Sequence, residues 1–239
     1  GSSVMKLLIT NDDGVFAPGI VELASALCRL GHECAVTAPD RERSSVGHSI
    51  TLTRPHRLWK AAPGPYPPEC PVFACDGTPS DCVVLGIEEV MAEPDLVVSG
   101  INHGSNMGDD VTYSGTVAAA MEANLMGIPP LAVSLATYGA TEYFPDAARV
   151  ALQVCRAMIR QGLPADTFLN LNIPNLPFAE IKAPLITRQG KRSFVGKIVD
   201  KIDPRGRKYY WIGSEEPSFV DDEGTDYNAV GKGHPSLTP

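Results

Sequence analysis

Three short polar clusters carry the side chains best suited to chemistry. Each follows an apolar run of strand length, and they occupy residues 11–14, 41–44 and 100–104. In an open parallel sheet, the loops at the carboxyl ends of the strands converge on one edge, where ligands bind. Two adjacent carboxylates, a serine hydroxyl and an asparagine amide oxygen from these clusters would form an all-oxygen set, which suits Mg²⁺ or Mn²⁺ and does not suit structural zinc. The four residues are Asp12, Asp13, Ser44 and Asn102.

A plainer interpretation of the first cluster stays open. Aspartates commonly close a turn or cap a helix at the end of a strand. Asp12 and Asp13 stand directly before Gly14, as such a turn requires. By itself the pair is therefore compatible with a turn as well as with a metal site.

Ser114, Gly115 and Thr116 stand where a helix is expected to begin, ahead of an alanine-rich segment. Free backbone N–H groups, two hydroxyls and the positive end of the helix dipole can bind phosphate without cationic side chains. An ordinary serine N-cap is the alternative. His48 and His103 lie in loops near the suspected site, and each is a candidate acid or phosphate ligand.

The charge and the missing signatures exclude several classes of function. The net charge is −8 at pH 7, so general binding to duplex nucleic acid or anionic membranes is not expected. The sequence has no P-loop motif, no G-x-G-x-x-G, no G-x-S-x-G and no H-E-x-x-H. This argues against P-loop NTPases, Rossmann dehydrogenases, α/β-hydrolases and zincin metalloproteases.

Several features predict a cytoplasmic protein. No apolar run of about 18 residues is present, and the N-terminus lacks the regions of a signal peptide. The 6 cysteines contain no C-x-x-C pair, and we expect reduced thiols in the core. We interpret residues 1–4 as a cloning remnant ahead of Met5 and leave them out of the fold interpretation.

Strands and helices alternate along most of the chain. Buried strands are expected at 6–10, 33–38, 95–99, 131–135 and 168–173, with shorter strands at 49–53 and 72–74. Helices are expected at 18–30, 79–90, from 114 onward and at 146–159, and a long loop at 100–113. This pattern predicts a doubly wound α/β fold with a mostly parallel sheet, and we assign residues 5–175 to one catalytic domain.

The pattern changes after Pro174. Segments 181–187, 194–202 and 208–212 are typical of strands around a turn at 203–206. We interpret residues 176–239 as a β-rich C-terminal segment whose hairpin, about 190–213, forms an arm. Because its apolar and aromatic side chains are too numerous for an arm free in water, we expect a homo-oligomer formed through this arm.

The motifs together closely resemble the stationary-phase survival protein SurE family. They are LITNDDG at 8–14, APDRERS at 38–44, GHSIT at 47–51, GTPSDC at 77–82, SGINHG at 99–104, SGT at 114–116, DPRG at 203–206 and YYW at 209–211. The resemblance covers nearly all of the chain from Met5. It implies a Rossmann-like fold whose C-terminal β-hairpin arm is exchanged in a dimer or tetramer.

The resemblance also implies an activity and a site. The activity is divalent-metal-dependent hydrolysis of nucleoside 5'-monophosphates, with some members accepting 3'-nucleotides or short polyphosphate. One Mg²⁺ or Mn²⁺ per subunit would be held by the same four oxygen donors that the strand ends indicate, with Asp12, Asp13 and Asn102 as the catalytic residues. The family's phosphate-binding positions fall on Ser114, Gly115 and Thr116, with Asn11 and Gly47 close by.

Alternatives of two other classes stay open. A Rossmann-like, metal-dependent glycosyl or nucleotidyl transferase would use a similar acidic site, and a non-catalytic nucleotide-binding module would bind without releasing phosphate. Within the phosphatase hypothesis, Asp12 or Asp13 could accept the proton of the attacking water. Asp12 could instead attack phosphorus and form an aspartyl-phosphate.

Overall fold

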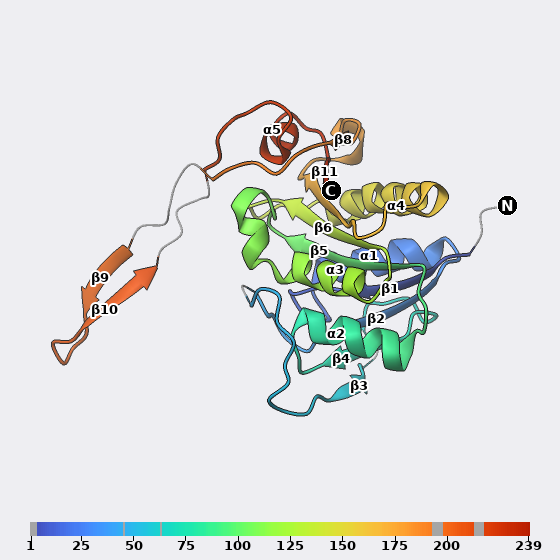
Figure 1. The fold of residues 1–239 in the computed structure, drawn as a ribbon, viewed down its shortest axis with the longest axis horizontal. Coiled ribbons are helices and arrows are strands. Elements are labelled where there is room, and N and C mark those ends of the chain that lie inside the picture. The colour runs from blue at the N-terminus through green and yellow to red at the C-terminus, as the bar shows by residue number, and fades with distance from the viewer. Residues whose placement is uncertain (1–3, 45, 63, 193–197, 213–217) are drawn as a thin grey trace.

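A nine-stranded sheet forms the centre of the molecule, with strand order β3-β4-β2-β1-β5-β6-β7-β11-β8 (Figure 1). The computed structural model describes residues 4–44, 46–62, 64–192, 198–212 and 218–239. The strands of this sheet are β1 (Lys6–Thr10), β2 (Glu33–Pro39), β3 (Leu58–Lys60), β4 (Val72–Cys75), β5 (Leu96–His103), β6 (Pro130–Ala136), β7 (Leu169–Pro174), β8 (Leu185–Ile186) and β11 (Ser236–Thr238).

The strands from β4 to β7 are parallel, whereas β3 pairs antiparallel with β4 and β11 antiparallel with β7. The order of the parallel strands is that of doubly wound folds, in which the chain reverses its direction across the sheet beside β1. This confirms the predicted α/β, Rossmann-like, mostly parallel sheet. The reversal lies between β1 and β5, and such a point is where ligands bind.

Helices cover both faces of the sheet. The main ones are α1 (Pro18–Arg29), α2 (Pro79–Leu85), α3 (Gly115–Leu125) and α4 (Phe144–Gln161), and a short α5 (Asp226–Gly231) lies near the C-terminus. α1 packs beside α4 and α2 beside α3 (Figure 1). In β1, Leu7 and Ile9 belong to the core cluster under α1 and α4, whereas Leu8 belongs to the cluster under α2 and α3. Burial on both faces explains why the middle of β1, from Leu7 to Ile9, is a continuous apolar run.

A β-bulge shapes the part of β5 that enters the predicted loop 100–113. Between the pairs Ser99↔Ala132 and Asn102↔Ser134, β5 has one residue more than β6. Gly100 has φ +149°, and a Cβ there would lie 2.4 Å from the Val133 carbonyl oxygen. The strand continues past this bulge to His103, whereas the sequence predicted that it ends at Ser99. The bulge changes the direction of the side chains that follow it. The rest of that segment contains a 3₁₀ helix, η2 (Gly108–Tyr113).

The prediction of a strand at 49–53 is wrong, because side chains at the start of α2 bind the backbone of this segment. The Thr51 N–H donates to Asp81 Oδ1 (2.9 Å), and the Ser49 carbonyl accepts from the Thr78 hydroxyl (2.8 Å). Of segment 181–187, only Leu185–Ile186 is a strand. The sequence interpretation missed β3, α5 and β11, which are short elements without a clear period.

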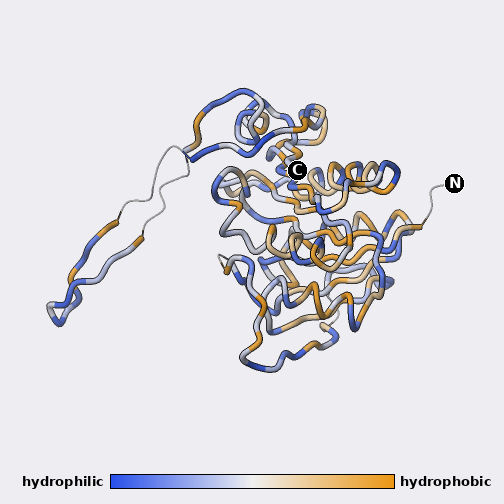
Figure 2. The backbone as a smooth tube through the Cα atoms, in the orientation of Figure 1, coloured by the Kyte–Doolittle hydropathy of each residue, from blue (hydrophilic) through white to orange (hydrophobic). Residues whose placement is uncertain are grey.

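The predicted hairpin is present as β9 (Ile198–Ile202) and β10 (Lys208–Ile212), which lie away from the sheet (Figure 1). The Asp203 carboxylate closes the turn by accepting from the N–H groups of Arg205 (2.8 Å) and Arg207 (2.9 Å). Every residue of both strands is exposed. Figure 2 shows hydrophobic positions at the ends of both strands that lie nearest the sheet. Residues 194–197 of the predicted segment lie outside the described residues.

The 6 cysteines are all buried and free, as predicted from their positions in apolar segments. No helix among the described residues has the length and apolar character needed to span a membrane.

Gly19→Ala tests how closely α1 must approach β5. A Cβ at Gly19 would lie 2.0 Å from the Ile101 carbonyl oxygen, so α1 would have to move away from the strand that carries Asn102. We expect the free energy of unfolding in urea to fall by about 1–3 kcal/mol, as for other overpacked cores. Gly231→Ala is the control, because a Cβ at this helical glycine meets nothing within 4 Å. Equal stability of the Gly19 variant and the wild type would contradict this description of the α1 contact.

Candidate functional site

The reversal point of the sheet brings together two of the predicted clusters. Asp12 and Asp13 follow β1, and Asn102 lies in the neighbouring strand β5. The backbone N–H of His103 donates to Asp13 Oδ2 (3.0 Å). The Thr116 hydroxyl, at the start of α3, donates to Asp12 Oδ1 (3.0 Å). The ends of β1 and β5 and the start of α3 therefore meet at the two carboxylates.

The two carboxylates are short of positive charge. Burial raises the pKa of Asp12 to about 7, and the neighbouring Asp13 adds to this rise. Burial also raises the pKa of Asp13, against the lowering effect of the His103 N–H, and the charges of Glu42 and Glu142 contribute to the rise. Among the described residues, no lysine or arginine forms an ion pair with either aspartate. Such a site fits a bound cation, which would favour both charged forms.

The Asn102 side chain is oriented by its own loop. Its Nδ2 donates to the carbonyl oxygens of Gly104 (2.9 Å) and His103 (3.3 Å). Because the nitrogen is used in these bonds, Oδ1 is the amide atom left to act as a ligand, and an amide oxygen suits a hard cation.

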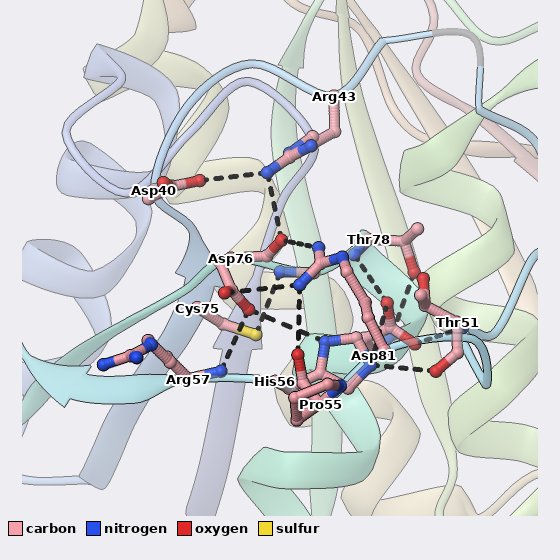
Figure 3. Close-up of polar contacts among 12 residues, drawn as sticks. Asp40, Arg43, Thr51, Pro55, His56, Arg57, Cys75, Asp76, Thr78 and Asp81 are labelled. Atoms are coloured by element: carbon pink, nitrogen blue, oxygen red, sulfur yellow. Dashed lines mark hydrogen bonds and ion pairs between the residues drawn. The ribbon is translucent and has the colours of Figure 1, made fainter.

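The loop that carries Ser44 is fastened beside Asp12. The Arg43 N–H donates to the Asp12 carbonyl oxygen (2.7 Å), and the Arg43 guanidinium contacts the Asp76 carbonyl oxygen (3.0 Å) and the Asp40 carboxylate (3.3 Å) (Figure 3). Ser44 itself is exposed, and its hydroxyl donates to Glu42 Oε1 (2.6 Å). The preceding residue, Arg43, thus holds this loop beside Asp12, whereas the Ser44 hydroxyl is directed to Glu42.

The start of α3 lies directly against Asp12. Ser114 caps the helix by accepting from the Val117 N–H (3.1 Å). A Cβ on Gly115 would lie 3.0 Å from Asp12 Cβ and 3.2 Å from Asp12 Oδ2. Glycine at this position lets the helix N-terminus approach the carboxylate, so an anion bound at the helix start would lie beside a cation bound by the aspartates.

The two flanking positions of the predicted phosphate site differ. Gly47 has φ +63°, and the group nearest to a Cβ there is the Thr112 carbonyl oxygen at 3.9 Å, just before Ser114. The Asn11 amide instead closes the turn after β1, donating to the Gly14 carbonyl oxygen (2.8 Å) and accepting from its N–H (3.3 Å). Gly47 therefore lies near the start of α3, whereas the Asn11 side chain is engaged within its own turn.

The sequence analysis did not identify two glutamates, Glu42 and Glu142, whose charges act on Asp13. Glu42 lies inside one of the recognised motifs, but nothing in its spacing distinguished it. Glu142 belongs to the segment after β6 and forms an ion pair with His103 Nε2 (2.7 Å). His48 similarly pairs with Glu122 of α3 (2.7 Å). These contacts join residues far apart in sequence, so no local pattern could have revealed them.

A second group of possible metal ligands is His56, Cys75 and Asp76, whose ligand atoms lie within 4.8 Å of one another (Figure 3). Asp76 accepts from the Arg57 N–H (3.0 Å) and pairs with the Arg54 guanidinium (3.3 Å), and these contacts lower its pKa. The positive charge already beside Asp76 makes this group a poorer cation site than Asp12 and Asp13.

The chain is similar to several known proteins in sequence and in fold. The family model described as Survival protein SurE matches residues 7–196. The 5'-nucleotidase SurE of Pelobacter propionicus is 59% identical over 98% of this chain and 92% of its own length, and that of Geobacter sulfurreducens is 58% identical over 98% and 87%. The crystal structure of the SurE protein from Aquifex aeolicus has a TM-score of 0.84 at 45% identity, covering 98% of this chain and 92% of that one.

Asp12→Asn tests the electrostatic state of the site in protein freed of divalent cations. Burial raises the folded-state pKa of Asp12 from 3.8 to about 7. The protonated carboxyl therefore contributes fully to the free energy of unfolding below the unfolded pKa, and this contribution is lost as the pH rises through the folded pKa. Above pH 7 in EDTA, the variant is therefore expected to have a higher free energy of unfolding than the wild type, measured with urea.

Asp76→Asn provides the control of opposite sign. Its folded-state pKa is lowered, so removing the carboxylate should reduce stability at neutral pH. If Asp12→Asn and the wild type had the same stability at every pH, the carboxylate at residue 12 would not be electrostatically unfavourable.

Proposed function

The chain belongs to the survival protein SurE family and is a 5'-nucleotidase, and from this premise we propose that it hydrolyses nucleoside 5'-monophosphates to nucleoside and inorganic phosphate with the help of one divalent cation, Mg²⁺ or Mn²⁺. The observation that carries the proposal is the contact between Asp12 and the start of α3. A cation and a phosphate bound there would lie side by side.

We assign the cation to Asp12, Asp13 and Asn102. Hydrogen bonds from Thr116 and His103 hold one oxygen of each aspartate in place. Ser44 would join as a fourth oxygen donor when its hydroxyl turns from Glu42, which is a rotation of a single exposed side chain. A divalent cation in this position supplies Lewis-acid polarisation of the phosphoryl group and lowers the pKa of water.

The phosphate is assigned to the start of α3, which we call the phosphate cradle: Ser114, Gly115 and Thr116. Backbone N–H groups at a helix N-terminus favour non-bridging phosphoryl oxygens and the negative charge that grows on them in the transition state. Gly47 lies near the segment that leads into this helix start, since a Cβ there would be 3.9 Å from the Thr112 carbonyl oxygen. Asp12 and Asp13 are the carboxylates within reach of the attacking water, and one of them accepts its proton.

Hydrolysis accounts for these features better than the alternatives do. The relatives that match over nearly the whole chain are named 5'-nucleotidases, which favours release of phosphate to water over a transferase or a module that only binds nucleotides. The Thr116 hydroxyl engages Asp12 Oδ1, so a direct attack on phosphorus would use Oδ2 and withdraw that oxygen from the cation, and activation of water is the simpler route. We extend the substrates to 3'-nucleotides and short polyphosphate, and place the protein in the cytoplasm, where the free cysteines stay reduced.

We further propose a homo-oligomer, a dimer or tetramer, formed through the hairpin of β9 and β10. Its register puts Ile198, Ile202, Tyr210 and Ile212 on one face of the ribbon. These side chains are 62% to 88% exposed. A two-stranded ribbon with such a face is unstable alone in water, and a second copy of the chain would cover it.

Removal of metal tests the nucleotidase mechanism. Protein treated with EDTA should release no phosphate from AMP, GMP or an aryl phosphate, and Mg²⁺ or Mn²⁺ should restore the activity. Asp13→Asn should lower turnover by about three orders of magnitude, because the Lewis-acid contribution of a cation is several kcal/mol. Asp76→Asn is the control and should keep the activity and its metal dependence. Full turnover in excess EDTA would refute the proposal.

Light scattering of the intact chain tests the assembly. We expect a mass at least twice the 25.5 kDa of one chain. Ile212→Glu should shift the protein towards the monomer because it places a charge on the apolar face of the hairpin. Arg205→Glu, in the turn of the hairpin, should leave the mass unchanged. A monomeric wild type at micromolar concentration would rule out the proposed oligomer.

A further inference from the structure

Asp226 is a fully buried carboxylate outside the site described above. It accepts hydrogen bonds from the N–H groups of Gly108 (2.9 Å), Gly190 (2.9 Å) and Tyr227 (2.7 Å). Its exposed fraction is 0%, and within the described ranges no cationic side chain pairs with it. A buried charge is tolerated only when hydrogen bonds replace its water. The Asp226 charge therefore depends on backbone groups contributed by distant segments.

The C-terminal part of the chain also binds the carbonyl oxygen of Gly108. The Gln189 side-chain amide donates to the Gly108 carbonyl oxygen (2.7 Å). Gly108 has φ +56°, and a Cβ there would lie 2.6 Å from the Phe219 ring. Segments 188–192 and 219–226, on either side of the hairpin, thus fix both the N–H and the carbonyl of this residue. We call them the C-terminal anchor.

The anchor also binds the next two residues of the loop. The Arg192 N–H donates to Asp109 Oδ2 (3.1 Å), and the Arg192 guanidinium pairs with Asp110 (3.3 Å). Asp109 and Asp110 lie in η2, which runs from Gly108 to Tyr113. The next residue, Ser114, is the N-cap of α3. The position of η2 therefore sets where the phosphate cradle begins.

The preceding part of the loop is fixed independently. The Asn106 N–H donates to Asn172 Oδ1 (2.8 Å), and the Asn106 carbonyl accepts from the side chains of Asn170 (2.8 Å) and Asn172 (3.0 Å). These two asparagines lie in β7. The sheet thus holds the loop up to Asn106, and the C-terminal anchor holds it from Gly108 to the cradle.

We propose that Asp226 is a positioning residue for the nucleotidase reaction, which holds η2 and thereby the phosphate cradle in place from the C-terminal anchor. The inference rests on the proposed cradle at Ser114, Gly115 and Thr116. Asp226 does not touch the substrate. Its effect passes through Gly108 and η2, and it connects the segments that flank the hairpin to the site.

The inhibition constant of inorganic phosphate tests this role. In Asp226→Asn, one of the N–H groups of Gly108 and Gly190 would face an amide NH₂ instead of an oxygen. We expect the constant for competitive inhibition by phosphate, and the KM for AMP, to rise about tenfold, as for loss of one hydrogen bond to a charged group. A merely structural role would reduce the folded fraction and the apparent kcat, but it would leave the inhibition constant unchanged.

Two controls match the substitution. Asp222→Asn breaks the exposed ion pair with Arg188 (2.6 Å) in the same anchor. Asp95→Asn removes a carboxylate that accepts the Lys6 N–H (2.7 Å) at the opposite end of the strands. Both should keep the wild-type inhibition constant. If Asp226→Asn does not fold, Gln189→Ala, which removes only the contact with the Gly108 carbonyl, is measured in the same way and should also weaken phosphate inhibition.

The outcomes separate the two proposals. Phosphate that inhibits the wild type competitively, with an unchanged constant in Asp226→Asn and Gln189→Ala, overturns the positioning role and leaves the cradle in place. Phosphate that does not compete with AMP in the wild type overturns the cradle, and the positioning role with it.

Discussion

The burial of two adjacent carboxylates at the end of a strand, more than their mutual repulsion, is the constraint on which the site depends. Asp12 and Asp13 follow β1, and the described part of the chain supplies hydrogen bonds to them but no lysine or arginine as an ion-pair partner. An arginine beside the two aspartates would neutralise their charge and occupy the space next to them. Because the chain leaves the charge largely unmatched, the folded protein has a negative centre that a proton or a cation would balance, and under our proposal the neighbouring helix start holds the phosphate beside that cation.

The protein handles its carboxylates in three different ways. Asp76 lies beside Arg54 and its pKa is lowered, so it is an ordinary ion-pair partner that ties down a loop. Asp226 is buried, has no ion-pair partner among the described residues and accepts hydrogen bonds from three N–H groups, so it joins distant segments of the chain. Asp12 is buried with its charge largely unmatched, and its pKa is raised. The last combination is typical of functional positions, because it costs stability that the fold alone does not require.

Much of the fold could be predicted from the sequence, because its central strands are buried on both faces and read as apolar runs. The Asp12, Asp13 and Asn102 positions could also be predicted, since parallel strands place their carboxyl ends on one edge. The alternation of polar and apolar residues at 49–53 misled the prediction. The backbone of this segment forms hydrogen bonds with side chains at the start of α2 and not with a neighbouring strand. Glu142 and Asp226 act on residues far away in the chain, and local patterns carry no information about such partners.

The separation of Gly108 and Asp226 along the chain has a consequence for how the protein matures during synthesis. Asp12 and Asp13, which follow β1, and Asn102 of β5 are made early, because the chain emerges from the ribosome with its N-terminal part first. The Gly108 N–H donates to the carboxylate of Asp226, which lies 118 residues further along the chain, so this hydrogen bond forms only after that residue has been made. A nascent chain can therefore assemble the central strands well before the loop in front of α3 is held in place, and the contacts that hold this loop are completed only after Asp226 has been translated.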